Sequence, residues 1–96
     1  MALVEVEILS DAMSATVMQI PGRRFAAIAL SGRSLYQLCH WARELAESVA
    51  RDDLETAQSA ALDLREVLTQ HLGIYEETLI GLDRQLPYPH SHADEQ

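Results

Sequence analysis

The first third of the chain contains three short runs of β-type residues. Residues 4–8 alternate valine or isoleucine with glutamate, a period of two that predicts a strand with one face in water. Ser10-Asp11-Ala12 predicts a turn, and residues 14–20 and 25–30 are further β-type runs. Between them, Pro21-Gly22 fits a type II turn, because Pro favours the φ of the first central position and Gly accepts the positive φ of the second. These runs predict an antiparallel meander.

The rest of the chain has apolar residues at helical spacing. Ser34 with Gln37 resembles a capping box and predicts the start of a helix. Asp52 with Glu55 repeats this pattern, so a second helix is expected near Leu54. The first core-facing stripe comprises Leu35, Leu38, Cys39, Ala42, Leu45, Ala46 and Val49, and the second comprises Ala57, Ala61, Leu64, Leu68, Leu72, Tyr75, Leu79 and Leu82.

Gly73 leaves two readings of the second helix. The helix either continues through this glycine at a cost of about 1 kcal/mol relative to alanine, or Gly73 ends a first segment as its C′ residue. The stripe keeps its phase across Gly73, so we favour one helix to about Arg84. The predicted fold is α+β: a three-stranded antiparallel meander followed by an αα-hairpin packed on one face. We expect one domain over residues 1–89 and a disordered polar tail over residues 90–96.

The charge of the chain bears on its partners. Fifteen acidic and seven basic residues, all of them arginine, give a net charge of −8. Such a charge disfavours direct binding to nucleic acid and suits a basic protein partner. The acidic residues expected on the outer helix faces, Glu44, Glu47, Asp63, Glu66, Glu76, Glu77 and Asp83, form either a partner surface or an ordinary solvated one.

Two arrangements that resemble catalytic or metal sites have simpler explanations. Ser34 follows Gly32 as in a nucleophile motif, but no base is well placed beside it, so we interpret it as a helix cap. Cys39 lies on the expected core stripe and His40 does not, so they diverge by about 100° around the helix. We therefore expect a buried structural cysteine, no metal site and no catalysis. The single cysteine, the charged N-terminal region and the absence of a long apolar run predict a cytoplasmic protein with no membrane segment.

The best candidates for a binding site are Arg23, Arg24, Arg33 and Tyr88. Three arginines close together can hold a carboxylate or phosphate through paired N–H donors. The alternative is that Arg23 pairs with an acid such as Glu5 and fixes the hairpin. Tyr88, between two prolines, is expected to dock the end of the chain on the sheet or to anchor an interface.

Several short motifs resemble a family of small bacterial proteins of unknown function. They are Pro21-Gly22-Arg23-Arg24-Phe25, Gly32 with Ser34-Leu35, Tyr75-Glu76, and Leu86-Pro87-Tyr88. The chain departs from the family pattern at Ala26-Ala27 and at Arg33. The resemblance implies three strands followed by two helices and a bacterial cytoplasmic protein, and it implies no activity or cofactor.

Three functional hypotheses follow. The first is a small acidic, non-catalytic protein-interaction module, comparable to the immunity proteins that neutralise toxins. The second is a binder of a small anion or metabolite that uses Arg23, Arg24 and Arg33. The third is a homodimer formed through the long second helix, whose last turns extend beyond the first helix.

Overall fold

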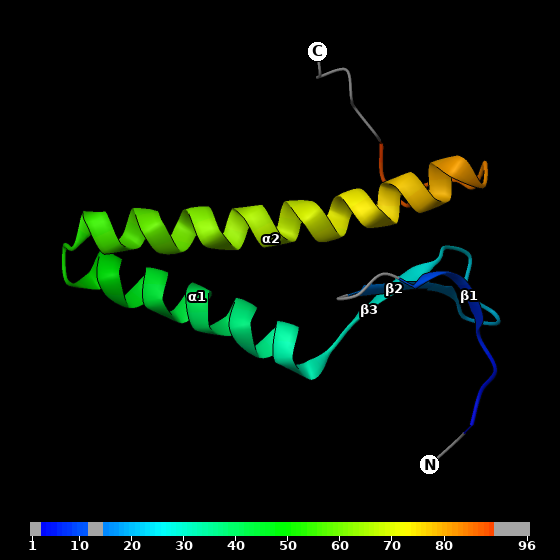
Figure 1. The fold of residues 1–96 in the computed structure, drawn as a ribbon, viewed down its shortest axis with the longest axis horizontal. Coiled ribbons are helices and arrows are strands. Elements are labelled where there is room, and N and C mark those ends of the chain that lie inside the picture. Colours follow the sequence, from blue (N-terminus) through cyan, green and yellow to red (C-terminus); the bar gives the residue numbers. More distant parts are fainter. Residues whose placement is uncertain (1–2, 12–14, 90–96) are drawn as a thin grey trace. The chain divides into compact units, whose positions relative to one another are not determined.

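The computed structural model of the chain describes residues 3–11 and 15–89. Strands β1, β2 and β3 comprise Glu7–Asp11, Ala15–Gln19 and Ala27–Leu30, and helices α1 and α2 comprise Gly32–Ala50 and Leu54–Gly81 (Figure 1). The α+β fold class, a three-stranded antiparallel sheet followed by two helices that pack against each other, is confirmed.

The chain forms two compact units. The sheet unit contains the residues up to Ala29 and those from Ile74 on, and the hairpin unit is Leu30–Gly73. Whether residues 1–89 act as one domain is not tested by this division and stays a prediction. The tail predicted at residues 90–96 lies outside the described residues.

Strand β1 differs from its predicted position. The strand expected at residues 4–8 begins only at Glu7 and continues through Ser10-Asp11, where a turn was expected. Ile8 pairs with Met18, the neighbour of the buried Val17, so it lies on the opposite face and is 52% exposed. Leu9, at the bulge between Ile8 and Ser10, packs on the core. The predicted inner face of this strand is therefore wrong, because a shift of one residue moves every side chain to the other face.

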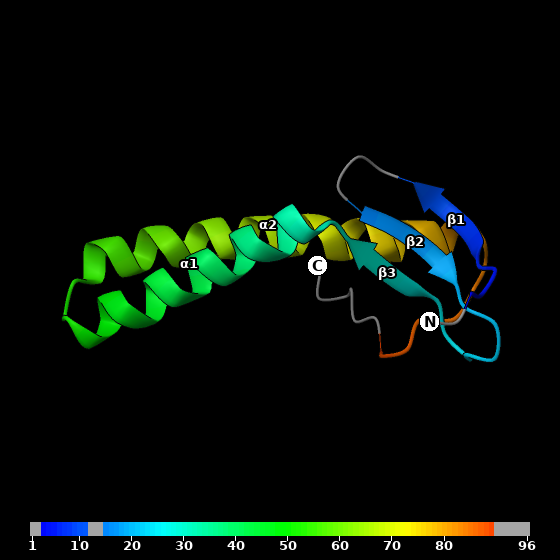
Figure 2. The same cartoon turned by 90° about the horizontal axis from the view of Figure 1, so that it is seen from below.

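The sheet has the order β1-β2-β3, with β2 in the centre (Figure 2). Ala15 and Val17 of this central strand are buried. Ala12 of the predicted first turn and Ser14 of the predicted second strand lie outside the described residues.

The turn after β2 is confirmed. The Arg23 N–H donates to the Ile20 carbonyl oxygen at 3.1 Å, and Gly22 between them has a φ of 80°. This is the backbone that a type II turn requires at its second central residue. The Gln19 side chain also donates to the Arg23 carbonyl oxygen at 2.8 Å, which ties the turn back to β2.

The core of the sheet unit is built where the end of α2 crosses the sheet. Val17, Tyr75 and Leu79 are its buried members. The Tyr75 hydroxyl donates to the Ala26 carbonyl oxygen at 2.6 Å, which joins α2 to the residue before β3. The partly buried residues around this cluster are Leu9, Ala26, Ile28, Ile74, Leu86 and Tyr88. Residues from Ile74 on therefore supply the helix that covers the sheet.

Helix α1 begins three residues earlier than predicted. Its N-cap is Ser31, whose hydroxyl oxygen accepts from the Ser34 N–H at 3.1 Å. Ser34, predicted to be the cap, is therefore the third helical residue. A serine three residues before another serine satisfies an unpaired helix N–H as well as the expected capping box does.

The turn between the helices depends on two aspartates. Asp52 has a φ of 63°, and the Asp53 N–H donates to the Ser48 carbonyl oxygen at 2.8 Å, which is the pattern of a Schellman C-cap. Asp53 then caps α2, because its carboxylate accepts from the Thr56 N–H at 3.2 Å. The predicted start of α2 is confirmed, but the capping residue is Asp53 and not Asp52.

Helix α2 is continuous through Gly73, as favoured from the sequence. It ends at Gly81, three residues before the predicted end. Asp83 has a φ of 58°, and the Arg84 N–H donates to the Leu79 carbonyl oxygen at 2.8 Å. The same C-capping motif therefore closes both helices, each time with an aspartate where glycine is more usual.

Candidate functional site

The arginines of the predicted site lie in different surroundings. Arg23 and Arg24 follow the turn and are exposed, and the Arg24 guanidinium lies over the Phe25 ring, 5.0 Å from its centroid. Arg33 lies in the first turn of α1, in the hairpin unit. That Arg23, Arg24 and Arg33 form one binding site stays a prediction.

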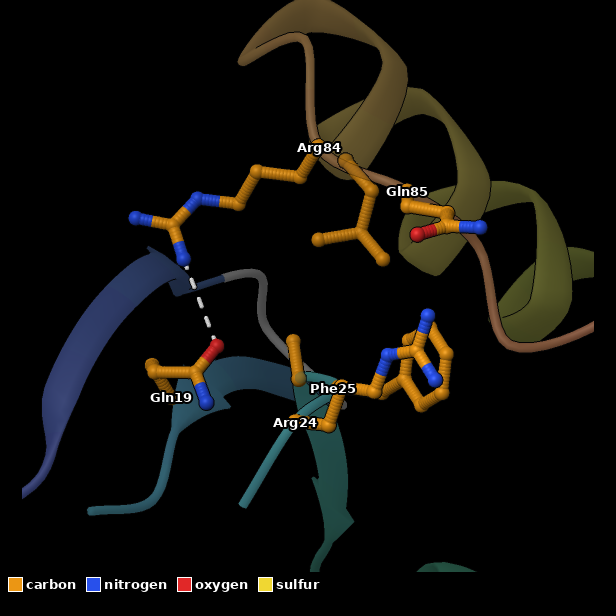
Figure 3. Close-up of a pocket in the computed structure, with 7 residues that line it drawn as sticks. Gln19, Arg24, Phe25, Arg84 and Gln85 are labelled. Carbon is orange, nitrogen blue, oxygen red and sulfur yellow. Dashed lines mark hydrogen bonds between the residues drawn. The ribbon is translucent and has the colours of Figure 1, made fainter. Parts of the chain in front are cut away.

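A pocket in the sheet unit joins Arg24 to an arginine that the sequence analysis missed. The cavity has a volume of about 180 Å³ and is lined by Gln19, Arg24, Phe25, Ala26, Leu79, Arg84 and Gln85 (Figure 3). No carboxylate is among these lining residues. Arg84 follows the end of α2 by three positions, and nothing in the local sequence distinguishes it from other surface arginines.

Arg84 is held by polar contacts to two strands. One terminal nitrogen donates to the Gln19 side-chain oxygen at 3.3 Å, drawn in Figure 3. The other lies 3.7 Å from a Glu7 carboxylate oxygen. The guanidinium groups of Arg24 and Arg84 lie on opposite sides of the pocket (Figure 3). Arg84 therefore resembles a structural link, the role that the sequence analysis considered for Arg23.

Tyr88 packs within the sheet unit. Its ring contacts the core cluster, and its hydroxyl donates to a Glu76 carboxylate oxygen at 2.9 Å. Burial is the main cause that raises the pKa of Tyr88 to about 12, and this hydrogen bond is the second cause. A role of Tyr88 in binding a partner stays a prediction.

The covered side of α1 is not the side predicted. Leu38 and Ser48 are buried, with Trp41 and Leu45 partly buried between them. Five members of the predicted core stripe are exposed instead: Leu35, Cys39, Ala42, Ala46 and Val49. The prediction of a buried Cys39 is therefore wrong. Because α1 has apolar residues over a wide sector, its sequence did not fix which part of that sector α2 covers.

Helix α2 shows the same displacement within the hairpin unit. Ala57 and Ala60 are buried against neighbouring residues, and Leu64 and Val67 are partly buried. Leu68 and Leu72 were predicted to lie in the core and are about half exposed.

These exposed residues form one surface, which we call the apolar face. Its members are Leu35, Cys39, Ala42, Ala46 and Val49 of α1, and Leu54, Ala61, Leu68 and Leu72 of α2. All are exposed except Ala61, which is partly buried. Its five large members are 47% to 71% exposed.

On both helices, each residue of the apolar face follows a covered residue by one position. This shared spacing explains why the exposed residues of α1 and those of α2 lie on the same side of the hairpin. Leu35 follows the partly buried Ser34 by one position, and Leu72 likewise follows the buried His71. One position is a rotation of about 100° around a helix. The same offset recurs along both helices, and the helices of a hairpin run antiparallel. Equal rotations about antiparallel axes bring both stripes to the same side of the hairpin.

The opposite side of the hairpin unit is polar. It carries Arg33, His40, Glu44 and Glu47 from α1, and Ser59, Asp63, Glu66 and Gln70 from α2. The Nε2 atom of His40 lies 3.6 Å from a carboxylate oxygen of Glu44. The charged residues nearest in angle to the apolar face are Arg43 and Arg65, by the same rotation of about 100° per residue.

His71 lies on the line where α2 is buried in the hairpin unit. Its side chain is 7% exposed, and neither ring nitrogen has a hydrogen-bond partner in the described part of the chain. An unsatisfied buried polar group costs about 1–3 kcal/mol. This residue therefore reduces the stability of the helix pairing.

Residues 3–11 and 15–89 contain neither a metal centre nor a membrane-spanning helix. No group of three or more His, Cys, Asp or Glu side chains there is arranged to hold a metal ion. No helix in this part of the chain is both long enough and apolar enough to cross a membrane.

A three-stranded antiparallel sheet followed by two helices, with an apolar face and an arginine-lined pocket, defines a small α+β protein. The chain belongs to a family of unknown function (DUF6959), whose sequence profile matches residues 1–88. No curated protein and no solved structure matches the chain. The predicted membership of a family of unknown function is thus confirmed, while the family motifs and the bacterial origin stay predictions.

Proposed function

We propose that this protein is a non-catalytic protein-interaction module that binds its partner through the apolar face of the hairpin unit. One observation carries the proposal: nine apolar or small residues from two neighbouring helices lie on one side of the hairpin, eight of them exposed. The largest contiguous apolar patch on a typical monomer covers about 300–600 Å² and is often a functional site.

The composition of the face supports its use as an interface. It contains no carboxylate, although the chain has 15 acidic residues. Depletion of charge at the centre with charged residues at the rim is typical of interfaces. Burial of a half-exposed leucine contributes about 1 kcal/mol, so five such residues supply a sizeable favourable term.

The net charge of −8 supports a second, electrostatic contribution. The carboxylates on the polar side attract a basic protein, as in the toxin-neutralising role considered from the sequence. The resemblance to small bacterial proteins and the single cysteine support a cytoplasmic location.

The native Cys39 provides a direct test, because it lies on the apolar face and is the only cysteine. A benzophenone maleimide attached to Cys39 is expected to cross-link a protein upon illumination in an extract of the source cells. The matched control is Cys39→Ser combined with Gln70→Cys, which moves the label to the polar side of α2. Equal cross-linking at both positions, or none at either, would contradict the proposal.

The pocket of Arg24 and Arg84 supports a second candidate, a small-anion binder. Two guanidinium groups line a cavity of about 180 Å³ without a carboxylate among its lining residues. A thermal-shift screen with phosphates and carboxylates tests this function. Stabilisation is expected to disappear in Arg24→Ala and to remain in Arg23→Ala, since Arg23 does not line the pocket. The absence of any stabilising anion excludes this candidate.

A further inference from the structure

We infer that the occupant of the apolar face is a second copy of this chain, so that two hairpin units pack face to face as a four-helix bundle. This inference rests on the proposed use of the apolar face as an interface. It adds the identity of the partner.

The spacing of the face is that of a helix-bundle seam. On α1 the exposed positions 35, 39, 42, 46 and 49 are separated alternately by four and three residues. On α2 the positions 54, 61 and 68 are seven residues apart and 72 follows four later, while the intervening positions of the same spacing hold the polar Gln58 and Arg65. A repeat of seven residues favours packing at about 20° between helix axes, the geometry of four-helix bundles.

The shape of the face fits a partner with two helices. The face consists of two parallel stripes, one on each helix of the hairpin, and a single partner helix fills only the groove between them. A second copy supplies two further helices with the same spacing. A two-fold interface uses the same patch on both subunits, so the patch must be complementary to itself.

Side-chain size varies along the face. Val49 and Leu54 are large and flank the turn, whereas Leu35, Leu68 and Leu72 are large and lie at the other end of the hairpin unit. Cys39, Ala42, Ala46 and Ala61 lie between these ends and are small. Small residues let helix backbones approach to the 8–10 Å typical of packed helices.

The area of the face also fits a dimer. A fully exposed leucine or valine side chain presents about 100 Å² of apolar surface, and burial of this surface contributes about 25 cal/mol per Å². Five such residues at 47% to 71% exposure, with four small ones, give roughly 450 Å². A standard interface buries about 800 Å² per partner, of which about 60% is apolar. The face supplies nearly all of that apolar share.

The charges around this face are compatible with a second copy. No carboxylate belongs to the face, so its self-association brings no carboxylates into contact. Arg43 and Arg65, the nearest charged residues, would meet either a basic partner or the same arginines of a second copy. In the dimer, the acidic sides of both copies point outward and remain open to a basic protein.

Light scattering of the purified full chain gives the first test. At about 100 µM, we expect twice the mass of the 10.7 kDa chain. Leu72→Glu places a charge on the face and is expected to lower the mass to that of one chain. Gln70→Glu places the same charge on the polar side of α2 and is expected to leave the dimer intact. A wild-type monomer, or a folded Leu72→Glu dimer, overturns the inference.

The reactivity of Cys39 gives a second test that needs no variant, in case Leu72→Glu does not fold. The dimer covers this thiol, so its rate of modification by a soluble maleimide is expected to fall at least tenfold between 1 and 100 µM chain. A constant rate while the mass doubles assigns the interface elsewhere and overturns the inference.

The two proposals fail in distinguishable ways. A monomeric purified chain whose Cys39 cross-links a protein of another mass retains the interaction module and removes the second copy. A monomer without any cross-linked product removes both.

Discussion

At the scale of single residues, the helix ends depend on aspartates in an uncommon conformation. Asp52 and Asp83 have φ values of 63° and 58°, which L-residues other than asparagine and aspartate rarely adopt. Each residue occupies the C′ position that glycine usually fills. Gly73, the alternative C′ residue weighed from the sequence, lies inside the helix, as the favoured reading expected.

Tyr88 predicts how stability changes at alkaline pH. Its folded-state pKa is about 12, above the ordinary value of 10.0, so the folded state retains the proton that the unfolded state loses. The resulting stability is complete below pH 10 and is lost as pH rises from 10 to 12. Tyr75 acts in the same direction, because burial raises its pKa.

Tyr88→Phe checks this dependence. Thermal melts should show a smaller loss of stability between pH 10 and 12 than the wild type shows. At pH 8 the variant should be less stable, because it lacks the hydrogen bond to Glu76. Tyr36→Phe, at a residue that is 70% exposed, is the control and should follow the wild type. Identical pH profiles for wild type and Tyr88→Phe would refute the assignment.

At the scale of secondary-structure elements, the start of α1 tests which serine is the cap. Ser31→Ala removes the oxygen that accepts from the Ser34 N–H and should lower the free energy of unfolding by about 1 kcal/mol. Ser34→Ala leaves that acceptor in place and should change stability by less than about 0.5 kcal/mol. Urea denaturation followed by circular dichroism measures both. A larger loss in Ser34→Ala would restore the original prediction.

The interior of α2 offers a stabilising substitution. A Cβ added at Gly73 meets no heavy atom within 4 Å, and alanine is favoured over glycine inside a helix by about 1 kcal/mol. Gly73→Ala should therefore raise the free energy of unfolding by about that amount. Gly22→Ala is the matched contrast and should be destabilising, because Gly22 has a φ of 80°. Equal effects of the two substitutions would show that backbone conformation is not the cause.

At the scale of the whole molecule, the net charge of −8 distinguishes two kinds of partner. Two like-charged copies repel each other over distances comparable to the Debye length, about 14 Å at 50 mM salt and 4–5 Å at 500 mM by the usual scaling. Higher salt should therefore strengthen the dimer. A complex with a basic protein should weaken instead. Dissociation constants measured by light scattering at both salt concentrations check this prediction, and a dimer that weakens with salt would contradict an apolar interface.

The sequence by itself determined the features that depend on neighbouring residues. The number and order of strands and helices, the Pro21-Gly22 turn and the continuity of α2 follow from local backbone preferences and hydrophobic periodicity. These preferences act over a few residues, so no knowledge of the rest of the fold is needed. The candidate site was predicted in part by the same means, since Arg24 lies beside the turn and lines the pocket.

The tertiary structure alone decided which faces are covered. The pairing of Ile8 with Met18 set the register of β1, and Arg84 reaches Gln19, 65 positions away in sequence. The apolar sector of α1 is wider than the part that α2 covers, so periodicity showed that the helix is amphipathic without showing which apolar residues stay exposed. The apolar face arises from that difference, because the position of a neighbouring helix is set by packing across the fold and not by spacing along the chain.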